Sequence, residues 1–364
     1  MQLIAYSIGA DIACETFEAV IQKVYANRTS EIVTKRSFNN TRGGHTQFVK
    51  WVGKNAPDRS LVHVVMEATG RYYEDLAYVL FNAQYRLSVV LPNKIKNFAR
   101  SLNEYSKNDP LDARIIATYG AMYNPKAWQP MSPLMRELRE LSRERQSLMG
   151  ILTQARNRLH ALTSSKCPRL DTVKRLKEQI KFFTRQIDQI EGEMDELRDG
   201  DEALQINHAL LCSIPFVGSV TAYTLLAETD GFALFENREQ LIKYAGLDII
   251  ENQSGSSVRG KTRISGRGNA RIRSAPYMGL AAVGNHDSVF GETYRRAIDK
   301  GMAKKQARTA TVRQVLKVAF GVVKSGQPYC EDTHRNRAGK RVGEPSSSPT
   351  VTEPRKQPVL EPQN

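Results

Sequence analysis

The stretch Ser106-Lys107-Asn108-Asp109-Pro110-Leu111-Asp112-Ala113-Arg114-Ile115-Ile116-Ala117 has the composition of a helix start. Proline is favoured at the first helical position, where its missing N–H is not needed, and Asp109 before it is a good N-cap. Asp112 follows three residues later, so both carboxylates lie on one side of the first turn. Two acids at a helix start are also an ordinary capping arrangement, so the rest of the chain must decide what they do.

Short apolar runs upstream of this helix predict a sheet. Four of them have the composition of buried strands: Leu3–Ile8, Phe17–Val24, Leu61–Met66 and Leu87–Leu91. Two segments between them have helical patterns: Gly43–Val52 and Tyr73–Asn82. The alternation predicts an α/β domain whose sheet is covered by helices.

Acidic residues lie at the ends of these strands. Asp11 closes the first strand and Glu67 the third, and Asp109 and Asp112 open a helix shortly after the last. Each acid alone has a structural explanation, as a turn residue or a strand-end charge. Four carboxylates that converge at one edge of a sheet would repel one another unless a cation neutralises them. Mg²⁺ is the natural partner for such oxygen ligands, and two ions about 3.5–4 Å apart would activate a phosphodiester.

Length and composition limit the possible functions. The chain has 364 residues, enough for two or three domains, and a net charge of +15, which suggests a polyanionic partner. No run of eighteen apolar residues is present, so no membrane span is expected. The four cysteines have no metal-binding or disulfide spacing, which fits a reducing cytoplasm.

A heptad pattern occupies the middle of the chain. Apolar residues recur at alternating steps of four and three from Leu134 to Leu162, with Arg145 as the one interruption, and again from Leu176 to Leu197. This pattern predicts two long antiparallel helices in a coiled coil. A solvated face and a phosphate contact explain the arginines of the first helix about equally well: Arg136, Arg139, Arg143, Arg145, Arg156 and Arg158.

The last third is mainly helical, with a basic loop inside it. An Ile-Pro-x-x-Gly turn at residues 214–218 resembles a helix-hairpin-helix, although such turns also simply join helices. Helices are expected over four segments: Ser219–Glu228, Glu239–Ala245, Arg273–Val283 and Thr309–Val323. Glycine and serine make residues 252–273 a loop whose cations suit a phosphate backbone: Arg259, Lys261, Arg263, Arg267, Arg271 and Arg273.

These motifs resemble those of the insertion-sequence-110 family of transposases, which includes the Piv-type DNA invertases. The first part is the DEDD motif, carried here by Asp11, Met66–Gly70 and Lys107–Ala113. The second part is carried by Gly246-Leu247, Ser254-Gly255 and Arg267-Gly268-Asn269-Ala270-Arg271, and the resemblance covers about residues 1 to 328. Asn108 stands where the family usually has threonine, and Ile249 where it usually has proline.

The resemblance implies a ribonuclease H-like (RuvC-like) domain with Asp11, Glu67, Asp109 and Asp112 as Mg²⁺ ligands. It also implies that Ser254 is the nucleophile that attacks a DNA phosphodiester, although Ser256, Ser257 and Ser265 compete on spacing alone. The resemblance further implies donor and target DNA as substrates, a bridge RNA as guide, and a homodimer or homotetramer.

Four segments are therefore expected. They are a RuvC-like catalytic domain (1–125), a coiled-coil linker (130–200), a mainly α C-terminal domain with the serine motif (205–325) and a disordered tail (326–364). The predicted function is that of a transposase or site-specific recombinase. A DNA invertase is a close relative of this prediction. A junction-cleaving nuclease that uses only the acids, and a non-enzymatic DNA-binding protein, are the alternatives.

Overall fold

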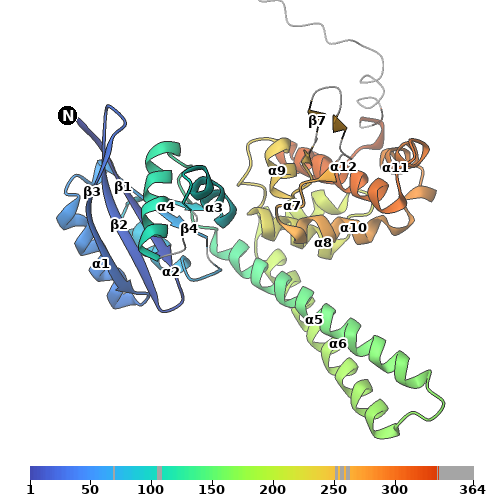
Figure 1. The fold of residues 1–364 in the computed structure, drawn as a ribbon. Coiled ribbons are helices and arrows are strands. Elements are labelled where there is room, and N and C mark those ends of the chain that lie inside the picture. The colour runs from blue at the N-terminus through green and yellow to red at the C-terminus, as the bar shows by residue number, and fades with distance from the viewer. Residues whose placement is uncertain are drawn as a thin grey trace, which may run out of the picture. The chain divides into compact units, whose positions relative to one another are not determined.

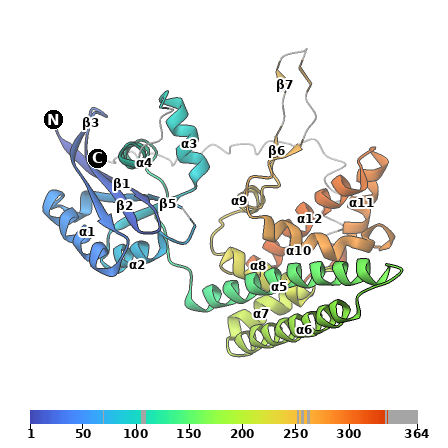
Figure 2. The same cartoon turned by 60° about the horizontal axis from the view of Figure 1, so that its bottom comes forward.

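The computed structural model describes residues 1–68, 70–104, 109–250, 253–254, 258–259, 263–333 and 335, with the backbone alone at 109–111, 253–254 and 258–259. The chain divides into two compact units, Met1–Pro130 and Met131–Asn364. Figures 1 and 2 show the elements of each unit.

The first unit is built on one mixed sheet. Its strands are β1 (Leu3–Ile12), β2 (Thr16–Tyr25), β3 (Ser30–Asn39), β4 (Val62–Glu67) and β5 (Arg86–Val90). They lie in the order β3-β2-β1-β4-β5, in which β1 to β3 are antiparallel neighbours and β4 and β5 run parallel to β1. This confirms the mixed α/β class that the alternating pattern predicts.

Helices cover both faces of this sheet. They are α1 (Arg42–Asn55), α2 (Glu74–Asn82), α3 (Pro92–Ser101) and α4 (Asp109–Tyr123). On one face of the sheet, strand residues such as Ile8 and Val64 pack with Phe48 of α1 and Leu76 of α2. On the other face Val65 packs with side chains of α3 and α4. Residues that alternate along β1 and β4 therefore point to different helices.

Strand β3 and helix α3 of this unit were not predicted from the sequence. Strand β3 buries only Phe38, and its other residues except Ile32 and Val33 are polar, as is common for an edge strand with one neighbour. Helix α3 begins at Pro92, directly after the strand expected at Leu87–Leu91, because proline suits the first turn of a helix as well as the end of a strand. Helix α4 begins at Asp109 itself, so Asp109 is the first helical residue and not the N-cap.

A buried histidine gives this unit a specific pH response. His63 Nε2 lies 2.8 Å from Ser88 Oγ, which donates to the carbonyl of Lys126 at 2.8 Å, so Nε2 carries a hydrogen and donates to Ser88. Burial, and then the charge of Arg86, lower the pKa of His63 to about 4. The unfolded chain therefore binds this proton near pH 6.5 and the folded chain does not.

We expect the free energy of unfolding to fall by up to about 3 kcal/mol between pH 7 and pH 4, since the unfolded state gains the proton first. Urea unfolding at pH 7, 5.5 and 4.5 measures it, with His63→Gln as the reference that isolates this group from the other histidines. An equal pH dependence in the variant and the parent protein would contradict the assignment.

The second unit begins with two long helices packed against each other, α5 (Pro133–Thr163) and α6 (Leu170–Asp199). Their buried residues include Leu138, Leu152, Leu176, Ile187 and Ile190, all of which belong to the apolar series read from the sequence. Arg145, which interrupts that series, donates from Nε to Glu191 of α6 at 2.6 Å. The interruption is therefore filled by an ion pair between the helices.

Shorter helices complete this unit around one apolar core. They are α7 (Glu202–Cys212), α8 (Ser219–Thr229), α9 (Arg238–Tyr244), α10 (Ala270–Gly279), α11 (Val289–Asp299) and α12 (Lys304–Ser325), with a short 3-10 helix, η2 (Leu280–Asn285), after α10. The four helices expected in this region are present, although α10 begins three residues early and ends in η2. Helices α7 and α11 were not predicted.

The folded part continues past the expected boundary at residue 326. Tyr329 donates its backbone N–H to Ser213 Oγ at 2.8 Å, and its ring stacks on Phe290. The expected tail beyond residue 335 lies outside the described residues. All four cysteines are unpaired and exposed, and none of the described helices is long and apolar enough to cross a membrane.

Candidate functional site

The acidic edge of the first unit starts with two neighbouring strand ends. In the parallel pairing of β1 with β4, Gly9 lies opposite Val65 and Ala10 opposite Met66. The next positions in this register are Asp11 and Glu67. Because side chains alternate along a strand, Asp11 shares the face of Gly9, and Glu67 shares the face of Val65. Two of the predicted acids are therefore side by side on one face of the sheet.

Helix α4 lies directly against this face. A Cβ added to Gly9 would lie 2.1 Å from the carbonyl oxygen of Ala113 and 2.4 Å from the nitrogen of Ala117. Farther down β1, Ser7 Oγ donates to the carbonyl of Ala117 at 2.6 Å. The helix therefore runs with its first turn at the carboxyl end of β1. This brings Asp112, next to Ala113, to the edge that carries Asp11 and Glu67.

The carboxylates at this edge are suitable ligands for a hard cation, but the described side chains do not by themselves form a complete metal site. Asp11, Glu67 and Asp112 are half-buried, and all three supply carboxylate oxygens. The backbone of Asp109 lies one helical turn before Ala113. Its side chain, together with Asn108, lies outside the described residues. Among the side chains that the structure describes, no three acidic, histidine or cysteine groups come close enough together to hold a metal ion.

The serine motif of the second unit lies on a β-ribbon between α9 and α10. Strand β6 (Ile249–Ile250) pairs with β9 (Arg263–Ile264), and farther out β7 (Gln253–Ser254) pairs with β8 (Val258–Arg259). Both pairs are antiparallel, and Ser254 lies opposite Val258. The segment was expected to be a loop, so the two short ladders are a correction. We call residues 249–264, which carry these two ladders, the finger; Figure 2 shows β6 and β7 above α9.

Gly246 and Gly268 allow close packing at the base of the finger. The backbone N–H of Gly266 donates to the carbonyl of Gly246 at 3.0 Å, and that of Asn269 donates to Tyr244 at 2.7 Å. A Cβ on Gly268 would lie 2.3 Å from the carbonyl oxygen of Tyr244, and Gly246 has a φ of +66°. The two halves of the sequence motif, 246–247 and 267–271, are thus one packed unit. Ser265 next to it donates its hydroxyl to Asp248.

The buried acid Glu228 binds residues at the start of α10, the helix that follows the finger. The side chain of Glu228, on α8, is 1% exposed and receives two hydrogen bonds from Arg143 of α5, at 2.7 and 2.9 Å. Asn269, the N-cap of α10, donates to the same carboxylate at 2.7 Å, and Arg271 Nε lies 3.8 Å away. Burial by itself would raise the pKa of Glu228, but the Arg143 and Asn269 hydrogen bonds, with the charges of Arg143 and Arg271, hold the pKa below its usual value.

The predicted phosphate-binding residues have different surroundings. Arg263 and Arg267 are exposed. Arg271 is held by the charge of Glu228, and its Nε is buried without a hydrogen-bond partner among the described residues. Arg273 donates to the carbonyl of Ala245 at 2.7 Å, at the end of α9. Lys261 and the side chains of Ser254 and Arg259 lie outside the described residues, as do the competing Ser256 and Ser257.

Sequence reasoning missed Glu228 and misjudged Arg143. The signal for Glu228 is that it is the one charged residue of Ser219–Thr229, an otherwise neutral helix. A solvated face and a phosphate contact were about equally good explanations for Arg143 and Arg145, but Arg143 is bound to this buried carboxylate and Arg145 to Glu191. Both arginines therefore stabilise the fold of the second unit.

Comparisons with known proteins agree with both parts of this description. Residues 8–168 match the model of a transposase family, the DEDD transposases of the IS110 type, and residues 208–295 match that of the transposase IS116/IS110/IS902 family. A pilin gene-inverting protein of Moraxella bovis is 30% identical over 328 residues, which cover 90% of this chain and 98% of that protein. The corresponding protein of Moraxella lacunata is 29% identical over 330 residues, with the same two shares.

Solved structures show weaker likenesses. The RuvC protein of T. thermophilus, in complex with a Holliday junction substrate, is 10% identical and covers 33% of this chain and 98% of its own, with a TM-score of 0.27. A Ppx/GppA family member of Aquifex aeolicus covers 94% of this chain and 99% of its own at 8% identity, with a TM-score of 0.21. The structural likenesses therefore add nothing to the sequence matches, which span nearly the full length. On those matches, the chain belongs to the IS116/IS110/IS902 family of transposases.

Proposed function

We propose that the protein is a DNA recombinase of an insertion sequence, which cuts and rejoins DNA strands at the acidic edge of its first unit. The observation that carries the proposal is the register of β1 and β4, which sets Asp11 beside Glu67 under the first turn of α4. The pilin gene-inverting relatives support recombination as the reaction, and inversion at fixed sites is a variant of it.

The four acids of this edge are the proposed ligands of divalent metal ions, with Mg²⁺ as the physiological choice. Asp11, Glu67 and Asp112 supply oxygen donors from one face of the sheet, and Asp109 adds a fourth from the start of α4. Bound ions would neutralise charge on the phosphodiester. The chain's own contribution is to hold three carboxylates at one edge through the close contact of α4 with Gly9.

Ser254 is the proposed nucleophile. In the proposed step its Oγ forms a bond to phosphorus while the bond from phosphorus to one deoxyribose oxygen breaks. The serine proton ends on the released DNA hydroxyl. Attack by a second DNA hydroxyl on the phosphoserine ester reverses these changes and restores the serine, so no external energy source is needed. Ser254 lies on β7, in the finger and outside its closely packed base. This position supports a role that requires access to DNA.

Further features of the family extend the proposal. The strand order β3-β2-β1-β4-β5 supports a RuvC-like, ribonuclease H-type first domain. The packed pair α5 and α6 supports an antiparallel coiled coil, and the α7–α8 turn with Gly218 as N-cap supports a helix-hairpin-helix-like element. A bridge RNA that pairs with donor and target DNA, and a dimer or tetramer that brings several active sites together, complete the proposed assembly.

One substitution set tests this function. Purified protein is incubated with supercoiled plasmid that carries the element's ends, with Mg²⁺ or with EDTA. Ser254→Ala should abolish both strand exchange and the covalent protein–DNA adduct, while Asp11→Asn and Glu67→Gln should each reduce cleavage about 10²–10³-fold. Ser265→Ala, with its hydroxyl bound to Asp248, serves as the matched serine control and should keep its adduct. Undiminished cleavage by Ser254→Ala would favour a junction nuclease, and unchanged activity in the acid variants would exclude catalysis at this edge.

A further inference from the structure

The α5–α6 pair carries its charge very unevenly. The half around the connecting loop, residues 150–185, contains nine lysine and arginine residues and two acids, Asp171 and Glu178. Residues 186–200, in the other half of α6, contain six acids and one arginine. We call residues 150–185 the hairpin tip. All nine cations of the hairpin tip are exposed: Arg156, Arg158, Lys166, Arg169, Lys174, Arg175, Lys177, Lys181 and Arg185.

Three of the six acids of residues 186–200 form ion pairs within α5 and α6. Glu191 pairs with Arg145 of α5 at 2.6 Å, and Arg198 pairs with Asp195 and Asp199 at 2.6 and 2.8 Å. Among the described residues, eight of the nine cations of the hairpin tip have no such ion pair; the exception is Arg169, which lies 4.0 Å from Asp171. The positive charge of the tip is therefore left for an external partner.

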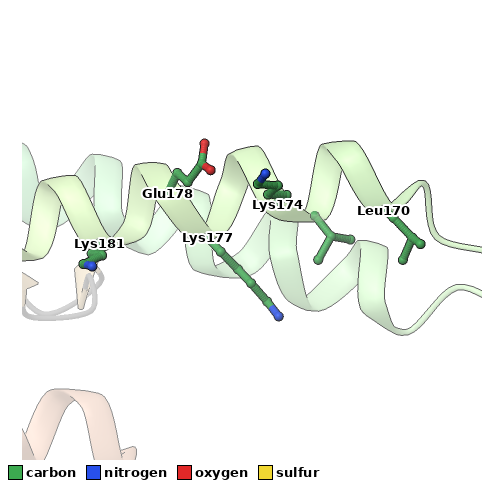
Figure 3. Close-up of a pocket in the computed structure, with 6 residues that line it drawn as sticks. Leu170, Lys174, Lys177, Glu178 and Lys181 are labelled. Atoms are coloured by element: carbon green, nitrogen blue, oxygen red, sulfur yellow. The ribbon is translucent and has the colours of Figure 1, made fainter.

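Part of this charge forms a stripe along α6. Lys174, Lys177 and Lys181 follow at steps of three and four residues, so they lie on one side of the helix, and Arg185 continues the series. With a rise of 1.5 Å per residue, the stripe is about 16 Å long. The lysines line a shallow hollow of about 410 Å³ together with Leu170, Val173 and Glu178. Figure 3 shows the three lysine side chains along α6, with Glu178 as the one acid between them.

We propose that the hairpin tip binds the phosphate backbone of a double-stranded nucleic acid. A duplex carries one negative charge per about 1.7 Å of its axis. This regular row of phosphates is a better partner for a rigid row of cations than the few scattered acids of a protein surface. Two copies of the tip would repel each other, so the tip does not explain self-association. The inference rests on the proposed function in one respect: that function makes nucleic acid, and not another polyanion, the expected partner.

The test compares the salt dependence of binding. The full-length triple variant Lys174→Gln/Lys177→Gln/Lys181→Gln is titrated onto fluorescein-labelled 30-base-pair DNA and RNA duplexes of one sequence, by anisotropy, at several NaCl concentrations. Each lost phosphate contact reduces the slope of log affinity against log salt by about 0.9, so we expect the slope to decrease by about 2 to 3. A decrease with DNA identifies the element or its target as the ligand, and a decrease with RNA identifies a structured RNA; both support the proposal.

The matched control removes three exposed cations elsewhere in the same unit: Lys300→Gln/Lys304→Gln/Lys305→Gln. It makes the same change in net charge and should leave the slope nearly as it is. An independent pair on α5, Arg156→Gln/Arg158→Gln, should lower the slope by about 1 to 2. An unchanged slope in both tip variants, an equal decrease in the control, or a changed oligomeric mass by light scattering in place of a changed slope would each overturn the proposal.

This experiment separates the tip from the catalytic proposal. Binding slopes are read without Mg²⁺, so they do not depend on cleavage. A tip-dependent slope in a protein that never cleaves DNA would leave the inference standing and refute the recombinase. Normal recombination with an unchanged slope would do the reverse.

Discussion

Gly9→Ala is expected to reduce strand exchange roughly 100-fold and to destabilise the first unit by about 3 kcal/mol. The added methyl carbon would meet the backbone of Ala113 and Ala117 at 2.1 and 2.4 Å, so α4 must move away from β1. Overpacking costs typically about 1–3 kcal/mol, and backbone atoms yield less than flexible side chains do. A shift of about 1 Å also misplaces Asp112 against Asp11 and Glu67, and this alone can cost about 10²-fold in rate.

Urea unfolding and the plasmid assay measure the two effects in one preparation. Gly150→Ala and Gly192→Ala are the matched controls, because both glycines are helical, exposed and have no atom within 4 Å of an added Cβ. They should stabilise α5 and α6 by about 0.5–1 kcal/mol through helix propensity. Normal stability and activity of Gly9→Ala would show that the contact between α4 and Gly9 does not set the position of Asp112.

Glu228→Ala should destabilise the second unit by about 3 kcal/mol. The variant leaves Arg143 without the carboxylate that takes both of its hydrogen bonds, and it frees the N-cap Asn269 and the neighbouring Arg271. Breaking a buried pair costs about 3–5 kcal/mol, and the lower figure applies here because Arg143 is 29% exposed. Thermal unfolding measures the loss of stability.

The control is Glu191→Ala, which breaks the more exposed pair with Arg145 and should cost less than about 1 kcal/mol. The pH dependence gives a second check. The folded pKa of Glu228 lies below its usual 4.5, so its contribution is complete above that pH and is lost as the pH falls through the lowered folded value. Equal losses in both alanine variants would show that Glu228 has no special role.

The sequence predicts the first unit well where burial is complete. The central strands are continuous apolar runs, and their ends carry the acids, so both the sheet and Asp11 with Glu67 could be found. The edge strand β3 leaves no comparable signal, because one neighbour and one covered face allow polar residues at most of its positions. The contact between Gly9 and α4 is also invisible in the sequence, since it depends on two segments more than a hundred residues apart.

The second unit shows a different limit. Helix periodicity identifies α5 and α6, but the choice between phosphate contact and internal pairing for Arg143 and Arg145 depends on which side of the helix meets α6 and α8. The basic segment after α9 was expected to be a loop because it is rich in glycine and serine. Its two-residue ladders are too short for any alternation of apolar residues to reveal them.

The base of the finger has one consequence for how such proteins can be altered. Three of its hydrogen bonds run from main chain to main chain, Gly266 to Gly246, Ser265 to Asp248 and Asn269 to Tyr244. Bonds of this kind do not depend on the side chains of residues 249–264. We therefore expect that residues 249–264 can be exchanged between homologues while these three bonds are kept.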